Sequence, residues 1–446
     1  MTLKGVLEHE KALQRIADRN GGNRAAGTPG YDASVDYVEW RLERAGYDVS
    51  RQSFTFFDFR ELGPSVLQQT APGTVTYVED TDFSVTDHSA PGDVTAAVTP
   101  VDITLGLGNT STSGCEAADF AGFPAGNIAL LQRGTCTFEI KGENAAAAGA
   151  VGIVFMNQGN TDAPDRNGIP AVTLGNGYTG GIPAVNATYA LGASLSATPG
   201  LTMRVFANVS RLLSENENLI AESRKGDPHN VVMAGAHLDS VREGPGINDN
   251  GSGSSALIEV AEQMAKLKLP NKLRFAWWGA EEANLVGSNH YVSQLDDAGL
   301  ADIEMYLNFD MVASPNYGLF IYDGDGSGFG LVGPDGSDEI EGLFEEYYAK
   351  RDIPSEPTAF SGRSDYQAFI NNGVPSGGLF TGAEGVKTAA QAAKWGGTAG
   401  TAYDPCYHAA CDTIANLSHR ALDINSDAIA YVIYLYASGR RVINAG

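Results

Sequence analysis

Three mainly apolar segments decide the fold of this 446-residue chain: NVVMAGAHLDS (230–240), NKLRFAWWGAEE (271–282) and EMYLNFDMV (304–312). Each has the length and apolar content of a buried strand, and each carries acidic or imidazole side chains at or near its end. The segment GSGSSALIEVAEQMAKL (251–267) lies between the first two and has the composition of a helix. Strands that alternate with helices predict a mostly parallel mixed sheet with helices on both faces, which collects ligands at the carboxyl ends of its strands.

The rest of the chain divides by composition. Residues 1–60 predict two amphipathic helices followed by a strand, and residues 204–446 continue the alternation of strands and helices. Residues 61–203 are rich in Gly, Ala, Thr and Val, poor in Lys and Arg, and broken by frequent turn signals. We therefore predict an α/β domain formed by residues 1–60 and 204–446, with a small β-rich domain inserted at 61–203.

Charge and cysteine content limit the possible partners and the compartment. The chain has 54 acidic and 29 basic residues, a net charge of −25, which disfavours nucleic acid as a partner. No apolar run approaches the roughly 18 residues of a membrane span. The four cysteines form two local pairs without a CxxC motif, which favours two disulfides and an oxidising compartment; they are Cys115, Cys136, Cys406 and Cys411. We expect a secreted, extracellular monomer.

Polar residues that could bind metal follow several of the predicted strands. The candidate ligands are His237, Asp249, Glu282, Asp310 and His408. Imidazole and carboxylate together suit zinc, and residues from several strand ends can converge only at one edge of the sheet. Two His, two Asp and one Glu make five ligands, so one bridging carboxylate would complete two sites of three protein ligands each.

Two further acidic residues suggest supporting roles around these ligands. Glu281 and Glu282 are adjacent, and neighbours on a turn point in different directions, so one can bind metal while the other acts as a general base. Asp239 lies two residues after His237, where it can accept a hydrogen bond that fixes the histidine tautomer.

Five motifs in order resemble the M28 family of zinc aminopeptidases, in particular its secreted bacterial leucyl aminopeptidases. They are HLDS (237–240), DNGSG (249–253), WGAEE (278–282), NFDM (308–311) and YHAACDT (407–413). The resemblance is strong over residues 204–446 and weak over the N-terminal segment. It implies hydrolysis of the N-terminal bond of peptides or proteins, with a preference for large apolar N-terminal residues such as leucine.

The same resemblance implies a role for each site residue. His237, Asp249 and Asp310 would hold one zinc ion, and Asp249 would bridge to a second ion held by Glu282 and His408. Glu281 would take a proton from the attacking water and pass it to the leaving amine.

Two cleft residues also match the family motifs. Tyr407 would hydrogen-bond the developing oxyanion. Arg363, in SGRSD (361–365), lies in a segment that helps to hold the free amino group of the substrate. The pair Cys406 and Cys411 brackets His408 and would rigidify this ligand loop.

The inserted region resembles a protease-associated (PA) domain. The resemblance rests on GNIALLQRGTCTFEIKGENAAAAGAVGIVFMNQ (126–158), which is similar to the strand–helix–strand core of that domain. It implies an internal disulfide between Cys115 and Cys136. Such a domain supplies no catalysis and often restricts access of substrate to the peptidase.

Three alternative functions stay open at this point. A glutaminyl cyclase of the same fold typically uses one zinc ion, and the five-ligand set argues against it. A carboxypeptidase needs a cation to recognise a carboxylate, and Arg363 is the only candidate. A non-catalytic binding ectodomain typically loses metal ligands, and none is lost here.

The acidity of the chain also leaves room for a structural calcium ion without naming its ligands. The stretch YDGDGSGFG (322–330), with Asp323 and Asp325, resembles a calcium loop but lacks the glutamate that such a loop requires. It is therefore predicted to be an exposed turn.

Overall fold

A computed structural model describes residues 1–443 and divides the chain into two compact units. The first unit comprises residues 1–56 and 215–446, and the second comprises residues 57–214. The expected boundaries, 60/61 and 203/204, lie four residues later and eleven residues earlier than these. The differences arise because strands β1 (Asp48–Glu61) and β10 (Val209–Glu222) run across both boundaries without a turn or a break in the strand.

The first unit is built on a mixed eight-stranded sheet in the order β1-β10-β12-β11-β13-β16-β14-β15. The remaining strands are β11 (Asp227–His237), β12 (Asn271–Trp278), β13 (Ile303–Phe309), β14 (Phe320–Tyr322), β15 (Glu356–Thr358) and β16 (Ser376–Phe380). The central strands β12, β11, β13 and β16 are mutually parallel, while β10 and β14 pair antiparallel with their inner neighbours. The predicted fold class, a mostly parallel mixed sheet, is confirmed.

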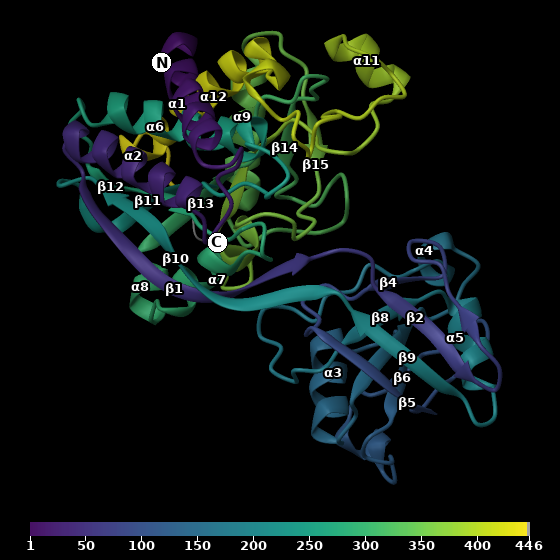
Figure 1. The fold of residues 1–446 in the computed structure, drawn as a ribbon. Helices are drawn as coiled ribbons and strands as arrows, with labels where there is room; N and C mark the ends of the chain where they lie inside the picture. The colour runs from purple at the N-terminus through teal and green to yellow at the C-terminus, as the bar shows by residue number, and fades with distance from the viewer. Residues whose placement is uncertain (444–446) are drawn as a thin grey trace. The chain divides into compact units, whose positions relative to one another are not determined.

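Helices cover both faces of this sheet. They are α1 (Leu3–Arg19), α2 (Pro29–Ala45), α6 (Gly253–Met264), α7 (Val286–Ser293), α8 (Asp297–Ala301), α9 (Ser337–Ala349), α10 (Tyr366–Ile370), α11 (Ala389–Trp395) and α12 (His419–Ala437). Figure 1 shows α1, α2, α6 and α12 on one side and α7 and α8 on the other. Strand β11 contributes side chains to the hydrophobic cores on both faces of the sheet. Val232 and Ala234 pack into one core, and Val231 and Met233 pack into the other. Burial on both faces explains its continuous apolar sequence.

The second unit is a smaller α/β body (Figure 1). It has its own eight-stranded sheet, in the order β3-β2-β9-β5-β6-β7-β8-β4. Its strands are β2 (Val66–Ala71), β3 (Val75–Thr76), β4 (Phe83–Val85), β5 (Gly92–Pro100), β6 (Ile128–Gln132), β7 (Gly152–Met156), β8 (Ala184–Ala187) and β9 (Thr202–Ala207). Its α-helices are α3 (Phe138–Ala147), α4 (Pro164–Asn167) and α5 (Tyr189–Ser196). Strands β5 to β8 are parallel, and two apolar clusters form its core.

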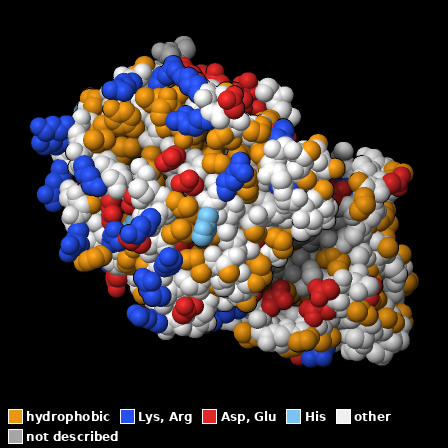
Figure 2. Space-filling model, turned by 90° about the horizontal axis from the view of Figure 1, so that it is seen from above, with side chains coloured by type: hydrophobic (Ala, Val, Ile, Leu, Met, Phe, Trp, Pro, Cys, Tyr) orange, Lys and Arg blue, Asp and Glu red, His pale blue; other side chains and the backbone are white. Residues whose placement is uncertain are grey.

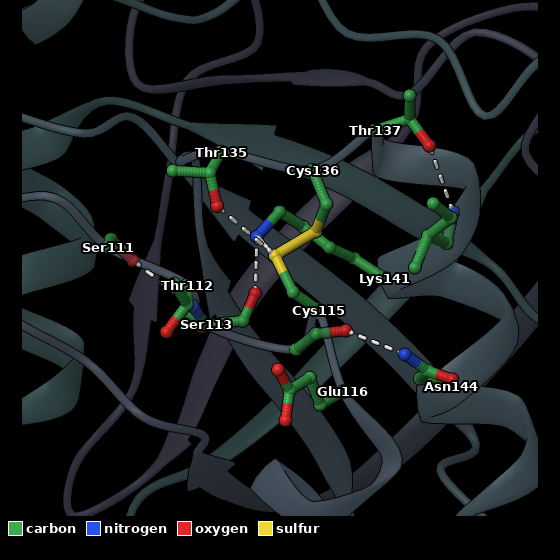
Figure 3. The surroundings of a disulfide bond; sticks show 12 residues. Ser111, Thr112, Ser113, Cys115, Glu116, Thr135, Cys136, Thr137, Lys141 and Asn144 are labelled. Carbon is green, nitrogen blue, oxygen red and sulfur yellow. Dashed lines mark hydrogen bonds between the residues drawn. A yellow bond between two sulfur atoms is a disulfide. The ribbon is translucent and has the colours of Figure 1, made fainter.

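A disulfide between Cys115 and Cys136 joins the loop before β6 to the start of α3 (Figure 3). Beside it, the buried Lys141 donates a hydrogen bond to the carbonyl of Ser113 and lies 3.5 Å from Sγ of Cys115. Burial lowers the pKa of Lys141 to about 8. Asn144 of α3 also donates to the carbonyl of Gly114 at 3.0 Å. Covalent and polar contacts therefore hold this loop against α3.

On the face seen in Figure 2, acidic, basic and apolar side chains are interspersed, so no uniformly acidic surface forms there. Among the described residues, no helix is both long enough and apolar enough to cross a membrane.

Candidate metal centre and active site

The parallel strands bring the predicted ligands to one edge of the sheet of the first unit. His237 is the last residue of β11, Asp310 directly follows β13, and Glu281 and Glu282 lie three and four residues after β12. Because β11 pairs in parallel with both β12 and β13, the three strand ends lie side by side. The sheet topology thus explains how residues far apart in sequence converge.

Asp249 reaches the same edge from the buried loop between β11 and α6. The carboxylate of Asp412 accepts the backbone N–H of Asn248 at 2.8 Å and that of Asp249 at 3.0 Å. The side-chain amide of Asn248 donates to Asp404 at 2.6 Å. These bonds fix the backbone that leads into Asp249 and so direct its carboxylate.

Five side chains form two groups of three that share Asp249. In the first group, Nε2 of His237 lies 3.3 Å from Oδ1 of Asp249 and 3.4 Å from Oδ1 of Asp310. In the second, Nε2 of His408 lies 3.3 Å from Oδ2 of Asp249 and 3.0 Å from Oε2 of Glu282. The two oxygens of Asp249 therefore face two different imidazoles.

Two observations test whether these groups fit zinc ions. Zinc bonds of about 2.05 Å in a tetrahedral site place neighbouring ligand atoms about 3.3 Å apart, close to the separations found here. In addition, Oδ1 of Asp310 and Oε1 of Glu282 are buried without a hydrogen-bond partner. A buried acceptor without a donor is costly, and a cation would satisfy it. The donor set therefore fits zinc.

The electrostatics of the site also favour a positive charge. Burial alone would lower the pKa of His408, but the carboxylates of Asp249 and Glu282 raise it to about 10. The pKa of buried His237 is likewise raised well above its usual value, because Glu281 and Asp310 outweigh the effect of burial. Burial and the nearby charge of Asp249 raise the pKa of Glu282 to about 7.

Asp239 supports the site differently from our expectation. The carbonyl oxygen of Asp239 lies 3.1 Å from Nδ1 of His237, whereas its carboxylate oxygen Oδ1 lies 3.7 Å away. That carboxylate instead accepts the backbone N–H groups of Glu281 at 3.2 Å and Glu282 at 3.3 Å. Asp239 therefore presents Nε2 of His237 to the site through its backbone, and it orients the glutamate pair through its side chain.

Ser364 is a supporting residue that the sequence did not reveal. Its hydroxyl donates to Oδ2 of Asp310 at 2.7 Å and accepts from the side-chain amide of Asn308 at 2.8 Å. The contact leaves Oδ1 of Asp310 to face His237. Its position beside Arg363 in SGRSD was the available signal, but a single serine has no distinctive spacing.

A cleft of about 280 Å³ opens over the two groups. Its lining includes Glu281, Arg363, Glu384 and Tyr407. The hydroxyl of Tyr407 accepts a hydrogen bond from Arg363 at 3.1 Å, and Arg363 also donates to Glu384 at 2.7 Å. The ring of Tyr407 stacks on that of His408 with 3.8 Å between centroids. The structure therefore brings Tyr407 and Arg363 to the same cleft as the five candidate ligands.

The loop that carries Tyr407 and His408 is closed by a disulfide between Cys406 and Cys411. The bridge joins residues only five positions apart, so it restricts the backbone on both sides of His408.

Apolar side chains also line the cleft and form part of its wall. They are Met311, Phe320, Tyr322, Phe380 and Tyr403. An apolar wall beside a buried polar centre is typical of a small-molecule or side-chain pocket.

Comparisons with known proteins agree with this architecture. Residues 218–433 match the model of peptidase family M28, and residues 94–195 match that of the PA domain. An aminopeptidase of Pseudomonas aeruginosa is 57% identical over 439 residues, which cover 98% of this chain and 82% of that protein. A probable leucine aminopeptidase 2 of Trichophyton verrucosum is 41% identical over 98% of this chain and 84% of its own length.

A solved structure has a similar fold. The aminopeptidase from Aneurinibacillus sp. strain AM-1 is 28% identical and superposes with a TM-score of 0.74, covering 100% of this chain and 96% of its own. The chain described here therefore belongs to peptidase family M28 and carries a PA domain. It is an aminopeptidase, a hydrolase, and the resemblance read from its motifs is confirmed.

Replacing Ser364 with alanine is expected to weaken metal binding in the first group by roughly 10- to 100-fold, because Asp310 loses the donor that orients it. Zinc retained after dialysis against graded chelator concentrations measures this effect. Ser361→Ala is the matched control, since Ser361 lines the cleft but its hydroxyl contacts Tyr366, 3.4 Å away. Equal zinc retention by the two variants would contradict the role of Ser364.

Proposed function

We propose that this aminopeptidase binds two zinc ions and removes large apolar residues from the N-termini of peptides. The observation that carries the proposal is the pair of three-residue groups that share the carboxylate of Asp249. His237 and Asp310 complete the first zinc site, and Glu282 and His408 complete the second. The zinc aminopeptidase of Bacillus subtilis has the same fold, with a TM-score of 0.60 at 24% identity.

Zinc ions at these positions supply electrophilic activation of the scissile carbonyl and of the attacking water. Glu281 is the general base in this proposal. Its carboxylate lies 3.9 Å from Nε2 of His237, at the side of the first group, and lines the cleft. It takes a proton from water as the water oxygen bonds to the carbonyl carbon. It then delivers that proton to the amine nitrogen as the C–N bond breaks.

Tyr407 is the proposed donor to the carbonyl oxygen as negative charge develops there. Arg363 donates to the hydroxyl oxygen of Tyr407, which leaves the hydroxyl hydrogen free to point elsewhere. The guanidinium of Arg363 cannot itself attract a positively charged amino group. We therefore assign it the positioning of Tyr407 and Glu384, while carboxylates of the cleft attract the substrate ammonium group.

The substrate preference rests on the cleft wall. Phe320, Phe380 and Met311 provide apolar surface for an N-terminal side chain. Related proteins of about 40% identity carry the name leucine aminopeptidase 2. Burial of additional methylene groups on such a surface favours leucine over alanine by about 1–3 kcal/mol for each group.

The alternative functions are less well supported. A carboxypeptidase would need an unpaired cation for the substrate carboxylate, and Arg363 is already paired with Glu384. The presence of both three-residue groups argues against a one-zinc cyclase and against a non-catalytic ectodomain.

Several broader features belong to the same proposal. The unit of residues 57–214 is an insertion that supplies none of the proposed catalytic residues, consistent with a PA domain between segments of the peptidase. Two disulfides favour secretion into an oxidising environment. We also propose that the protein acts as a monomer without a nucleic-acid or membrane partner.

Glu281→Gln is expected to lower kcat by about 10²- to 10⁴-fold while both zinc ions are retained, because the variant keeps its shape but cannot accept a proton. Zinc content and kcat measured on the same preparation test this. Glu345→Gln serves as control, because it removes the same charge at an exposed position on α9. A variant that keeps full activity would exclude Glu281 as the base.

The exopeptidase proposal predicts cleavage of leucine p-nitroanilide and no cleavage of its N-acetylated form. Cleavage should be lost on chelation, return with zinc, and be slower for the alanine analogue. A rate for the acetylated substrate equal to that of the free amine would contradict the requirement for an N-terminus. Comparable kcat/KM for alanine and leucine would contradict only the apolar preference.

A further inference from the structure

A third cluster of carboxylates lies outside the zinc centre, where β14 leads into α9. Asp323 directly follows β14, Asp325 lies two residues further on, and Glu341 lies in the first turns of α9. One carboxylate oxygen from each of the three residues lies within 4.8 Å of the other two. The prediction of an exposed turn is wrong for Asp323, which is only 1% exposed, while Asp325 is exposed as expected.

Backbone amides hold two of these carboxylates in place. Oδ2 of Asp323 accepts the N–H groups of Gly328 at 3.1 Å and Phe329 at 2.8 Å. Oε2 of Glu341 accepts those of Gly324 at 2.8 Å and Asp325 at 3.2 Å. These amide donors fix the orientation of both carboxylates.

The second oxygen of Asp323 gives independent evidence for a ligand. Oδ1 is buried and has no hydrogen-bond partner, although Oδ2 of the same group has two. Within residues 1–443, none of the three carboxylates forms an ion pair with a Lys, Arg or His side chain. A cation between them would satisfy the buried oxygen and offset the repulsion of like charges.

We propose that Asp323, Asp325 and Glu341 bind one calcium ion. The donors are all oxygen, without the imidazole or thiolate that favours zinc. Calcium accepts six to eight oxygens in flexible geometry, so water and backbone carbonyls can complete its shell, whereas magnesium demands a near-ideal octahedron. The ion would join the end of β14 to α9, and Phe320 and Tyr322 of β14 form part of the cleft wall. Calcium therefore stabilises one wall of the substrate cleft.

Equilibrium dialysis of the zinc-saturated protein against radioactive calcium tests the site. We expect one calcium ion per chain with a dissociation constant on the order of 10⁻⁴–10⁻³ M, as in extracellular calcium modules. Asp325→Asn and Glu341→Gln should each weaken binding about tenfold or more, since affinity follows the charge of the ligands. Asp325 is exposed, so its replacement leaves the packing intact, and retained zinc with an unchanged circular dichroism spectrum verifies folding.

Asp335→Asn is the matched control, because Asp335 is an exposed residue of the same loop outside the cluster. It should bind calcium like the unaltered protein. Absence of calcium binding by the unaltered protein would overturn the proposal. Calcium binding by Asp325→Asn and Glu341→Gln as tight as that of the unaltered protein would also overturn it, since the ion would then lie elsewhere. Because zinc is saturating throughout, either outcome leaves the two-zinc proposal untouched.

Discussion

The carboxylate of Asp249 is the contact on which the arrangement of the site depends. Each of its two oxygens lies 3.3 Å from a different imidazole, one on His237 and the other on His408. A rotation of this one side chain would therefore separate both groups at once. The carboxyl group itself is buried among other acidic residues, an arrangement that is costly unless positive charge balances it. In our account, zinc provides that balance.

Such a centre requires rigid surroundings, and two features of the fold provide them. Parallel strands fix the backbone of His237 and Asp310, because β11 and β13 pair directly with each other. Carboxylates that accept backbone amides fix the loops: Asp412 holds the loop of Asp249, and Asp239 holds the turn of Glu281 and Glu282. These supports let several acidic groups converge without rearrangement of the backbone, which pre-organises the site for metal and substrate.

The fold and the convergence of the candidate ligands could be predicted because they depend on short-range patterns. The apolar strands that end at His237 or shortly before Glu281 and Asp310 are continuous apolar runs of strand length, and parallel topology then requires their ends to meet at one edge. The supporting contacts could not be predicted in this way. The bond between Asp412 and Asp249 joins residues 163 positions apart, and the bond between Ser364 and Asp310 joins residues 54 apart. The burial of Asp323 likewise depends on α9, which the local sequence of its loop does not reveal.

The role of Asp249 as a shared ligand is tested most directly by counting zinc ions per chain in purified variants by elemental mass spectrometry. We predict two ions in the unaltered protein, one in His408→Ala, and less than one in Asp249→Ala, because only Asp249 belongs to both groups. An Asp249→Ala variant that retains as much zinc as His408→Ala would contradict the account. It would show that Asp249 serves one ion, and that the second ion is held without it.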